Sequence, residues 1–475
     1  MKNIKADIAI IGAGSGGLSV AAGAAQLGLK VVLFERGEMG GDCLNTGCVP
    51  SKALIAAGKR AQALRTAAQF GVAAIAPQID WAAVKAHVHG VIATIAPVDS
   101  QERFEGFGVT VVREHARFTG RRTLASDSVS VTARKMIIAA GGRASAPPIP
   151  GLAGVPYLTN ETIFTAPDFP QKLIVLGAGP IGIELGQAFA RLGAQVVIVE
   201  AAQALARFDA EVAQLALHAL AQEGVRILAG AKASAARAVA GGVELDVTRA
   251  DGATETLAGS HLLVAAGRTP NTDGLDLDKA GVAFDRSGVK TDAYLRTTNP
   301  AIYAVGDIAG KEQLTHAAGW HASALVRTLL FRAATRADSL PMPAAVYCEP
   351  EVAQVGLTLA QAQALHGAKA KAVRWTFEEN DRAQAERSAE GLVKLVIGPG
   401  GAILGGAAAG EGVGDMIGIV GFCIANNLKV RALTNWIAPY PTRIEALKRA
   451  AGAVYTPVLF SPRTRRLVSL LWKLP

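Results

Sequence analysis

The start of the chain passes from an apolar run through a glycine-rich stretch to a second apolar run. Residues 6–36, ADIAIIGAGSGGLSVAAGAAQLGLKVVLFER, predict a buried strand that ends at Gly12, a helix of small residues, and a strand that ends at Glu35. The same order recurs over residues 172–200, KLIVLGAGPIGIELGQAFARLGAQVVIVE, which close on Glu200. The hydrophobic pattern therefore predicts two βαβ units.

Both units carry glycines at the spacing G-x-G-x-x-G: Gly12, Gly14 and Gly17 in the first, and Gly177, Gly179 and Gly182 in the second. The first glycine makes a tight turn, the second lets the backbone approach a pyrophosphate, and the third lets helix and strand pack closely. Glu35 and Glu200 lie where a carboxylate can hold a ribose hydroxyl. Glu200 favours NADH, although Arg207 nearby keeps NADPH as an alternative. Two dinucleotide sites are expected; one inactive copy of a duplicated fold is the other interpretation.

Beyond these units, short apolar strands run into glycines in three stretches: 135–151, 261–272 and 297–310. The proline-rich residues 146–150 and the segment RADSLPMP (336–343) indicate linkers. From about residue 343 onward, strands and helices alternate without a glycine fingerprint. This last region is predicted to be a separate domain.

The chain has 475 residues, including 52 glycines and only four cysteines, and a formal net charge of +9. This length predicts about three domains of ~100–200 residues. No apolar run reaches the ~20 residues of a membrane-spanning helix, and the first run suits a strand better than a signal peptide, so a cytoplasmic protein is expected. The positive charge favours anions such as dinucleotides or an acidic membrane, and does not by itself predict nucleic-acid binding.

Two of the cysteines, Cys43 and Cys48, are separated by only four residues. In a reducing compartment, such a pair is more often catalytic or metal-binding than structural. No nearby His or Cys completes the four ligands that zinc usually needs, so no metal site is expected. Two inert buried thiols are the remaining alternative. Cys348 and Cys423 lie in apolar surroundings and are predicted to be core residues.

Four features together resemble the flavin-dependent pyridine nucleotide–disulfide oxidoreductases: GGDCLNTGCVPSK, the two glycine motifs, VAAGRTPN and AIYAVGDIAG. This is the family of dihydrolipoamide dehydrogenase, glutathione reductase and mercuric reductase. The resemblance covers nearly the whole chain and implies an α/β fold, with two Rossmann-like dinucleotide-binding domains and a C-terminal α+β interface domain that forms a homodimer. The implied domains are 1–150 with 271–340 for FAD, 151–270 for NAD(P), 341–455 for the interface, and 456–475 as a basic amphipathic tail.

The resemblance also implies which residues bind the two cofactors. For FAD they are Gly12, Gly14, Gly17, Glu35, Gly141 and Asp307. For NADH, with NADPH as the alternative, they are Gly177, Gly179, Gly182, Glu200 and Gly267.

The same resemblance implies that Cys43 and Cys48 form a redox-active disulfide. Cys48 would be the charge-transfer thiol against the flavin, Cys43 the interchange thiol that meets the acceptor, and Lys52 would lie near the flavin, paired with Glu184. The residue types agree, because Pro50 suits the first turn of a helix, and a helix N-terminus with a nearby lysine lowers a thiol pKa. Electrons would pass from NAD(P)H through FAD to this disulfide, and on to a disulfide, a soft metal ion or another small-molecule acceptor.

One position departs from the dithiol-oxidising members of the family. They carry His-Pro-Thr in the interface domain, with a Glu five residues after the His, whereas here APYPTRIEALK places Tyr440 at the His position and keeps Glu445. Mercuric reductase also has Tyr there. A tyrosine with a pKa near ~10 does not exchange protons at neutral pH as a histidine near ~6.5 does, so rapid dithiol turnover is not expected. Mercuric reductase delivers Hg²⁺ to its disulfide through a cysteine pair near its C-terminus. No cysteine follows Cys423 here, so efficient mercury reduction is not expected either. The other interpretation makes Tyr440 an aromatic core residue.

Two histidines and the tail complete the sequence predictions. His316 and His321 are expected to serve helix packing. The tail interleaves basic and apolar residues: Arg463, Arg465, Arg466 and Lys473 with Leu467, Leu470, Leu471 and Trp472. This pattern suits either an acidic membrane surface or packing on the dimer.

Three rival functions follow from the same residues. One is a dihydrolipoyl dehydrogenase-like activity, and the second is a diaphorase that reduces quinones or dyes from FAD without the cysteines. The third is a non-catalytic, membrane-associated redox sensor.

Overall fold

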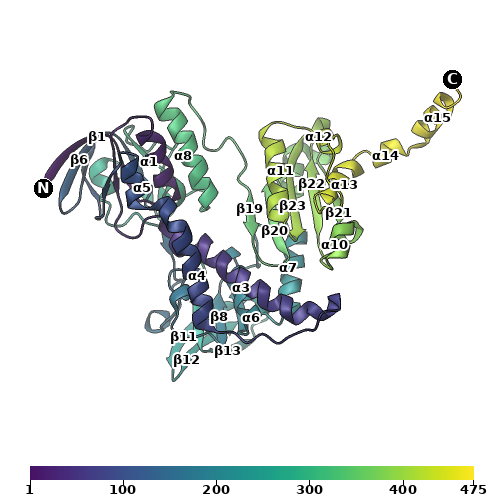
Figure 1. Cartoon of the computed structure of the whole chain (residues 1–475), viewed down its shortest axis with the longest axis horizontal. Coiled ribbons are helices and arrows are strands. Elements are labelled where there is room, and N and C mark those ends of the chain that lie inside the picture. The colour runs from purple at the N-terminus through teal and green to yellow at the C-terminus, as the bar shows by residue number, and fades with distance from the viewer. Residues whose placement is uncertain (475) are drawn as a thin grey trace. The chain divides into compact units, whose positions relative to one another are not determined.

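Residues 1–474 are described in a computed structural model, which contains both predicted βαβ units (Figure 1). The first consists of β1 (Lys2–Ile11), α1 (Ser15–Ala25) and β2 (Val31–Phe34), with the two strands paired in parallel. β6 (Val129–Ile138) pairs in parallel with the other edge of β1. The apolar run of β1 is therefore central in its sheet, which explains why its last four residues are all buried.

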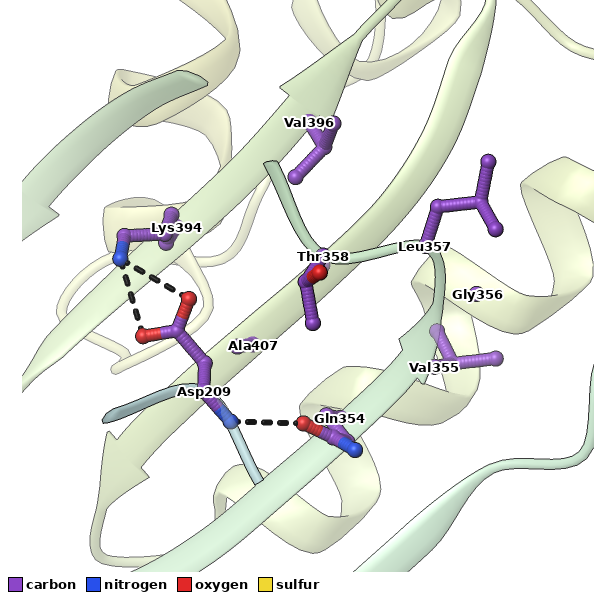
Figure 2. Close-up of a pocket in the computed structure, with 10 residues that line it drawn as sticks. Asp209, Gln354, Val355, Gly356, Leu357, Thr358, Lys394, Val396 and Ala407 are labelled. Carbon is purple, nitrogen blue, oxygen red and sulfur yellow. Dashed lines mark hydrogen bonds and ion pairs between the residues drawn. The ribbon is translucent and has the colours of Figure 1, made fainter. Parts of the chain in front are cut away.

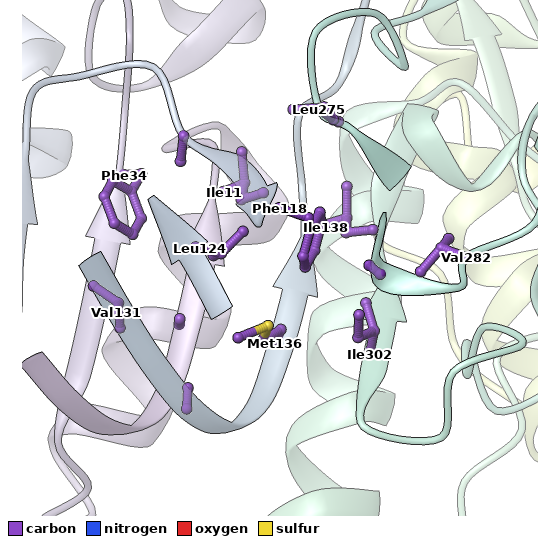
Figure 3. Packing of buried hydrophobic residues seen from close by; sticks show 14 of the residues in the cluster. Ile11, Phe34, Phe118, Leu124, Val131, Met136, Ile138, Leu275, Val282 and Ile302 are labelled. Atoms are coloured by element: carbon purple, nitrogen blue, oxygen red, sulfur yellow. The ribbon is translucent and has the colours of Figure 1, made fainter. Parts of the chain in front are cut away.

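This sheet has the strand order β3-β2-β1-β6-β5-β4, and β18 pairs with the second half of β6. The additional strands are β3 (Thr110–Val112), β4 (Arg117–Gly120), β5 (Thr123–Ala125) and β18 (Ile302–Ala304). One face of the sheet packs into a core that Figure 3 shows, with residues that include Phe34, Phe118, Leu124, Met136, Ile138 and Ile302. Because β1, β6 and β18 are parallel, the segments that follow them leave at one edge of the sheet.

The second βαβ unit consists of β8 (Lys172–Leu176), α6 (Pro180–Arg191) and β9 (Gln195–Glu200). β14 (His261–Val264) pairs in parallel with β8. An antiparallel ribbon joins β7 (Gly142–Ala144) to β15 (Arg268–Pro270). A three-stranded antiparallel sheet is formed by β11 (Lys232–Val239), β12 (Gly242–Thr248) and β13 (Thr254–Gly259).

The C-terminal region forms an antiparallel sheet of five strands in the order β19-β20-β23-β22-β21. Its strands are β19 (Ala344–Val346), β20 (Glu351–Gly356), β21 (Lys371–Thr376), β22 (Leu392–Ile397) and β23 (Ile403–Gly410). The helices α11 (Val413–Ala425) and α13 (Glu445–Ala453) pack on the sheet and share one apolar core with it. This is the predicted α+β domain.

The remaining helices and short strands connect these layers. They are α2 (Gly41–Asn45), α3 (Cys48–Thr66), α4 (Trp81–Ile95), α5 (Gln101–Gly106), α7 (Ala210–Gln222), β10 (Arg226–Ala229), β15 (Arg268–Pro270), β16 (Phe284–Asp285), β17 (Gly288–Val289), α8 (Thr315–Leu330), α9 (Leu359–His366), α10 (Asp381–Ala385), α12 (Val430–Thr434), α14 (Thr456–Leu459) and α15 (Pro462–Leu471).

The chain divides into two compact units: residues 1–201 with 230–339, and residues 202–229 with the chain from 340 onward. The predicted domain borders at 150, 270, 340 and 455 stay a prediction. Among residues 1–474, no helix is both long enough and apolar enough to cross a bilayer.

Candidate active site

The two glycine loops have the same construction. In the first, Gly12 has a φ of +101°, and a Cβ on Gly17 would lie 1.9 Å from the Gly12 carbonyl oxygen. The Glu35 carboxylate accepts a hydrogen bond of 2.6 Å from the Ala13 N–H. In the second loop, the Glu200 carboxylate accepts one of 2.9 Å from the Ala178 N–H. Each acidic residue that closes a βαβ unit thus lies against its glycine loop.

Both glycine loops end at the N-terminus of a helix that has no side-chain cap. Gly14 is the N-cap of α1 and Gly179 that of α6, and neither helix receives a side-chain hydrogen bond there. The first N–H groups of such helices attract phosphate oxygens through hydrogen bonds and the helix dipole. These donors and the adjacent carboxylates fit the phosphates and riboses of two dinucleotides.

The short helix α2 packs closely against the first glycine loop. A Cβ on Gly41 would lie 2.7 Å from the Cα of Gly14, and Gly41 has a φ of +62°. A side chain at Gly41 would therefore both clash and strain the backbone. This close approach holds the segment that carries Cys43 beside the first glycine loop.

Cys43 and Cys48 are free thiols that lie near enough to shift one another's pKa. Cys43 lies in α2 and is half-buried, whereas Cys48 is the first residue of α3 and is exposed. The Cys48 Sγ lies 3.3 Å from the Thr315 Oγ1, at the start of α8. The two sulfurs are therefore close together, as a dithiol–disulfide couple requires, and the predicted disulfide stays a prediction.

The surroundings separate the pKa values of the two thiols. The hydrogen bond from Cys43 lowers the pKa of Cys48 to about 6, helped by Thr315 and the positive charge of Lys52, while burial and Glu184 oppose the change. The same hydrogen bond and burial raise the pKa of Cys43 above its ordinary range. At neutral pH, Cys48 is therefore the thiolate and Cys43 is the protonated thiol.

This difference predicts an unusual pH dependence of cysteine alkylation. In the reduced protein, iodoacetamide should modify Cys48 at a nearly constant rate above pH ~7, and the rate should fall about tenfold per pH unit below the Cys48 pKa of about 6, because only the thiolate reacts. Mass spectrometry of quenched samples measures the rate at each cysteine. A midpoint near the ordinary thiol value of ~8.5 would contradict this assignment.

Lys52 and Glu184 form the ion pair that the family resemblance implies. The Lys52 Nζ lies 2.8 Å from the Glu184 Oε2, and the Glu184 side chain is only 6% exposed. The pair joins α3 to α6, so it links the cysteine-bearing helix to the second glycine unit. A nearly buried carboxylate needs such a partner, since an unpaired buried charge is strongly destabilising.

Asp307 belongs to a carboxylate–guanidinium–carboxylate cluster. The Arg268 Nη2 lies 2.6 Å from the Asp42 Oδ2 and 3.5 Å from the Asp307 Oδ2. Burial raises the pKa of Asp307, and the charge of Asp42 adds to this, while Arg268 opposes it. The Asp42 Oδ1 also accepts a hydrogen bond of 3.3 Å from Asn160. Arg268 thus bridges the residue before Cys43 to the predicted FAD ligand Asp307.

Gly141 and Gly267 are the remaining glycines that the family resemblance assigns to cofactor binding. Gly141 immediately precedes β7 and Gly267 immediately precedes β15, the two strands of one antiparallel ribbon. Both glycines have positive φ angles, +65° and +159°. The structure brings these two predicted cofactor-binding positions to the same short ribbon.

The other cysteines and the central histidine are packed inside the protein. Cys348 is 1% exposed and Cys423 is 3% exposed, as predicted for core residues. His321 is buried, and its Nδ1 accepts a hydrogen bond of 3.2 Å from the Gly306 N–H. Burial lowers the pKa of His321 to about 4, so the imidazole is neutral. His321 is therefore a packing residue, as expected.

Tyr440 is not a core residue, since its side chain is 69% exposed. Its hydroxyl donates a hydrogen bond of 2.7 Å to the Asp381 Oδ2, at the start of α10. This bond and the negative charges of Asp381 and Glu445 raise the pKa of Tyr440. Asp381 is thus the hydrogen-bond partner of the phenol. Glu445, which keeps the family spacing, affects the phenol pKa only through its negative charge.

The small pocket in the second compact unit offers no room for a substrate. Figure 2 shows it beside the Asp209–Lys394 ion pair, in which the Lys394 Nζ lies 2.9 and 3.0 Å from the two carboxylate oxygens. Its volume of about 10 Å³ holds roughly one water molecule. Within residues 1–474, no cluster of three or more His, Cys, Asp or Glu side chains is arranged to hold a metal ion.

Sequence reasoning did not find three residues around the cysteine pair, Asp42, Arg268 and Thr315, nor Asp381, the partner of Tyr440 in the second unit. Asp42 adjoins Cys43 in the sequence and could have been singled out for that reason. The contacts of the other three arise only through the fold.

Comparisons with known proteins place the chain in a family. Residues 6–322 match the pyridine nucleotide-disulphide oxidoreductase family, and residues 342–451 match the dimerisation domain of the same family. A mercuric reductase of Streptomyces lividans is 34% identical over 454 residues, which cover 94% of this chain and 95% of that protein. Dihydrolipoyl dehydrogenase 3 of Pseudomonas aeruginosa is 35% identical over 471 residues, covering 94% and 98%.

A solved structure is similar over the same length. The HOCl-induced flavoprotein disulfide reductase RclA from Escherichia coli, in a Cu(II) complex, matches with a TM-score of 0.84 at 26% identity, over 94% of this chain and 100% of that one. The chain belongs to the pyridine nucleotide-disulphide oxidoreductase family. It is an NAD(P)H-dependent flavoprotein oxidoreductase that uses FAD, and its dimerisation domain supports a homodimer.

Proposed function

We propose that this enzyme passes electrons from NAD(P)H through the Cys43–Cys48 pair to a thiophilic metal cation, chiefly Cu²⁺, with Hg²⁺ a slower acceptor, as the sequence predicts. One observation carries the proposal: two adjacent thiols with separated pKa values, one of them a thiolate at neutral pH. Thiolates are the preferred protein ligands of soft metal ions. Relatives named as mercuric reductases and the Cu(II) complex of RclA support this choice of acceptor.

The proposed cofactor contacts follow the two glycine loops. The N-terminus of α1, Glu35 and Asp307 would hold FAD, while the N-terminus of α6 and Glu200 would hold NADH, with NADPH as the alternative. When bound, FAD accepts a hydride from the nicotinamide and delivers two electrons to the cysteine pair. The Lys52–Glu184 pair connects the cysteine-bearing helix to the nucleotide-binding unit and supplies a positive charge near Cys48.

The two thiols then carry the metal reduction. The Cys48 thiolate and the Cys43 thiol would bind the cation, with the Cys43 proton released on binding. Oxidation of both sulfurs to one disulfide supplies two electrons, which reduce two Cu²⁺ to Cu⁺ or one Hg²⁺ to Hg⁰. The second proton is not released, because Cys48 is already deprotonated near pH 7. The next NAD(P)H returns the disulfide to the reduced pair.

Tyr440 supports a metal acceptor better than a dithiol. In the homodimer proposed from the family resemblance, the interface domain of each subunit completes the site of the other. A phenol held by Asp381, with a raised pKa, stays protonated at neutral pH and cannot take the proton of an incoming dithiol. A metal cation brings no proton to be removed, so the absence of a histidine should have little effect on the rate of metal reduction.

An acceptor comparison tests the proposal. With NADH, the purified holoenzyme should reduce Cu²⁺ at least about tenfold faster, in kcat/KM, than it reduces a small disulfide. The same value should also exceed, by about tenfold, the kcat/KM for oxidation of dihydrolipoamide with NAD⁺. Formation of Cu⁺ is followed with a Cu⁺-specific chelator, and quinones serve as the diaphorase control. Faster turnover of a quinone than of either metal, together with full activity after both thiols are alkylated, would favour the diaphorase instead.

A further inference from the structure

The C-terminal tail, residues 456–474, has no buried residue in either of its helices. α14 and α15 follow α13 at the end of the chain (Figure 1). The family match ends at residue 451, before the tail begins. The proposed metal reductase activity gives the tail no role, so its side chains need a separate explanation.

The tail exposes an unusual density of large apolar side chains. Leu470 is 64% exposed and Trp472 is 88% exposed. The complete set is Val458, Leu459, Phe460, Leu467, Val468, Leu470, Leu471, Trp472 and Leu474. Water does not favour this surface, and contiguous exposed apolar patches of this kind mark sites of association.

The helix α15 combines an apolar face with basic side chains along its borders. Leu467, Leu470 and Leu471 recur at i, i+3 and i+4 on one face. Arg466 and Lys473 border that face, because they lie four residues before and three residues after Leu470. The tail carries four basic residues and no acidic residue, in a chain whose net charge is +9. An apolar face with a rim of one charge sign is typical of helices that lie in the headgroup region of a bilayer.

Hydrogen bonds fix the corner between the two tail helices. The Ser461 Oγ accepts a hydrogen bond of 3.2 Å from the Thr464 N–H, and the Thr464 hydroxyl donates one of 2.7 Å to the Val458 carbonyl. Ser461 is thus the N-cap that defines where α15 begins. Phe460 immediately precedes this N-cap.

We propose that the tail binds the surface of a bilayer that contains anionic lipid. The leucines and Trp472 would enter the boundary between headgroups and acyl chains, while the basic side chains contact lipid phosphates. A second copy of the tail is a poorer partner, because two basic helices without acidic residues repel each other, and interface cores are depleted in charge. This inference does not depend on the identity of the electron acceptor.

Vesicle co-sedimentation tests the proposal with the full-length holoenzyme. We expect binding to vesicles of phosphatidylcholine with phosphatidylglycerol, weaker binding to phosphatidylcholine alone, and no binding of a variant truncated after Tyr455. The triple variant Arg463→Gln, Arg465→Gln and Arg466→Gln should bind about a hundredfold more weakly, since each basic residue near an anionic surface contributes about a fivefold factor.

Two further variants separate the contributions of charge and apolar contact. The pair Leu470→Ser and Leu471→Ser should also abolish sedimentation, because charge alone does not insert the helix. The control Arg122→Gln, Arg134→Gln and Arg286→Gln removes the same net charge from exposed positions outside the tail and should bind as the unmodified protein does. All variants should keep their flavin absorbance and their NADH oxidation in solution.

Equal, negligible sedimentation of the full-length and truncated proteins would overturn the proposal. If that result came with a change of oligomeric state on truncation, measured by light scattering, the tail would instead pack on a second subunit. Equal losses in the tail triple variant and its control would also overturn it, because binding would then reflect overall charge rather than this helix.

Discussion

Replacing either Cys43 or Cys48 by serine is expected to lower NADH-driven reduction of Cu²⁺ or Hg²⁺ by roughly 10³-fold or more. A serine hydroxyl neither binds soft metal ions nor forms a disulfide, so the two-electron route through sulfur is lost. The measurement is steady-state kcat/KM with each metal. The two variants should differ in spectrum, because Cys48 is the thiol with the lowered pKa of about 6 and Cys43 is not.

Controls must show that the serine variants still accept electrons from NADH. Anaerobic flavin reduction and quinone turnover should stay within about twofold of the unmodified protein, since neither needs the sulfur pair in this account. Cys423→Ser, at a buried position away from the pair in sequence, controls for general loss of a thiol. Metal reduction that survives in both Cys43→Ser and Cys48→Ser would reject the proposed route.

Replacing Tyr440 by histidine is expected to create dithiol activity. Dihydrolipoamide-dependent reduction of NAD⁺ should rise by about 10²-fold, because an imidazole can accept the thiol proton that the phenol cannot. The negative charges of Asp381 and Glu445, which raise the pKa of the phenol, are expected to stabilise the protonated imidazole. The new activity should increase with pH through the histidine pKa near ~6.5, since only the neutral imidazole accepts a proton.

Two variants make this test specific. Tyr440→Phe removes the hydroxyl without adding a base and should show no gain. Tyr440→His combined with Asp381→Asn should lose part of the gain and shift the pH profile downward, because the negative charge that stabilises the protonated imidazole is gone. No gain in Tyr440→His, in a protein that still forms dimers and reduces its flavin with NADH, would contradict the role given to this position.

The local features of the fold could be predicted from the sequence because their causes are local. The strand that ends at Gly12 and the helix that follows it depend on apolar periodicity and on a glycine spacing that sterics require. The ion pair between Lys52 and Glu184, 132 residues apart, could be anticipated only through the family resemblance, since no short-range pattern connects its members.

The remaining contacts depend on how distant segments meet. Thr315 reaches Cys48 across 267 residues of sequence, and Asp381 reaches Tyr440 across 59. A threonine at a helix start and an aspartate after an asparagine carry no signal of these roles. The lowered pKa of Cys48 could be anticipated from the helix start and Lys52, but the contribution of Thr315 to it required the structure.

Anaerobic titration of the oxidised holoenzyme with NADH, followed by absorbance, tests the central claim most directly. We expect the first equivalents to reduce the Cys43–Cys48 disulfide and to produce a long-wavelength band from the Cys48 thiolate beside the flavin, before the flavin itself bleaches. This band should disappear as the pH falls through about 6 and should be absent in Cys48→Ser. Bleaching of the flavin by the first equivalent of NADH, with no long-wavelength band at any pH, would contradict the claim that electrons leave through these two sulfurs.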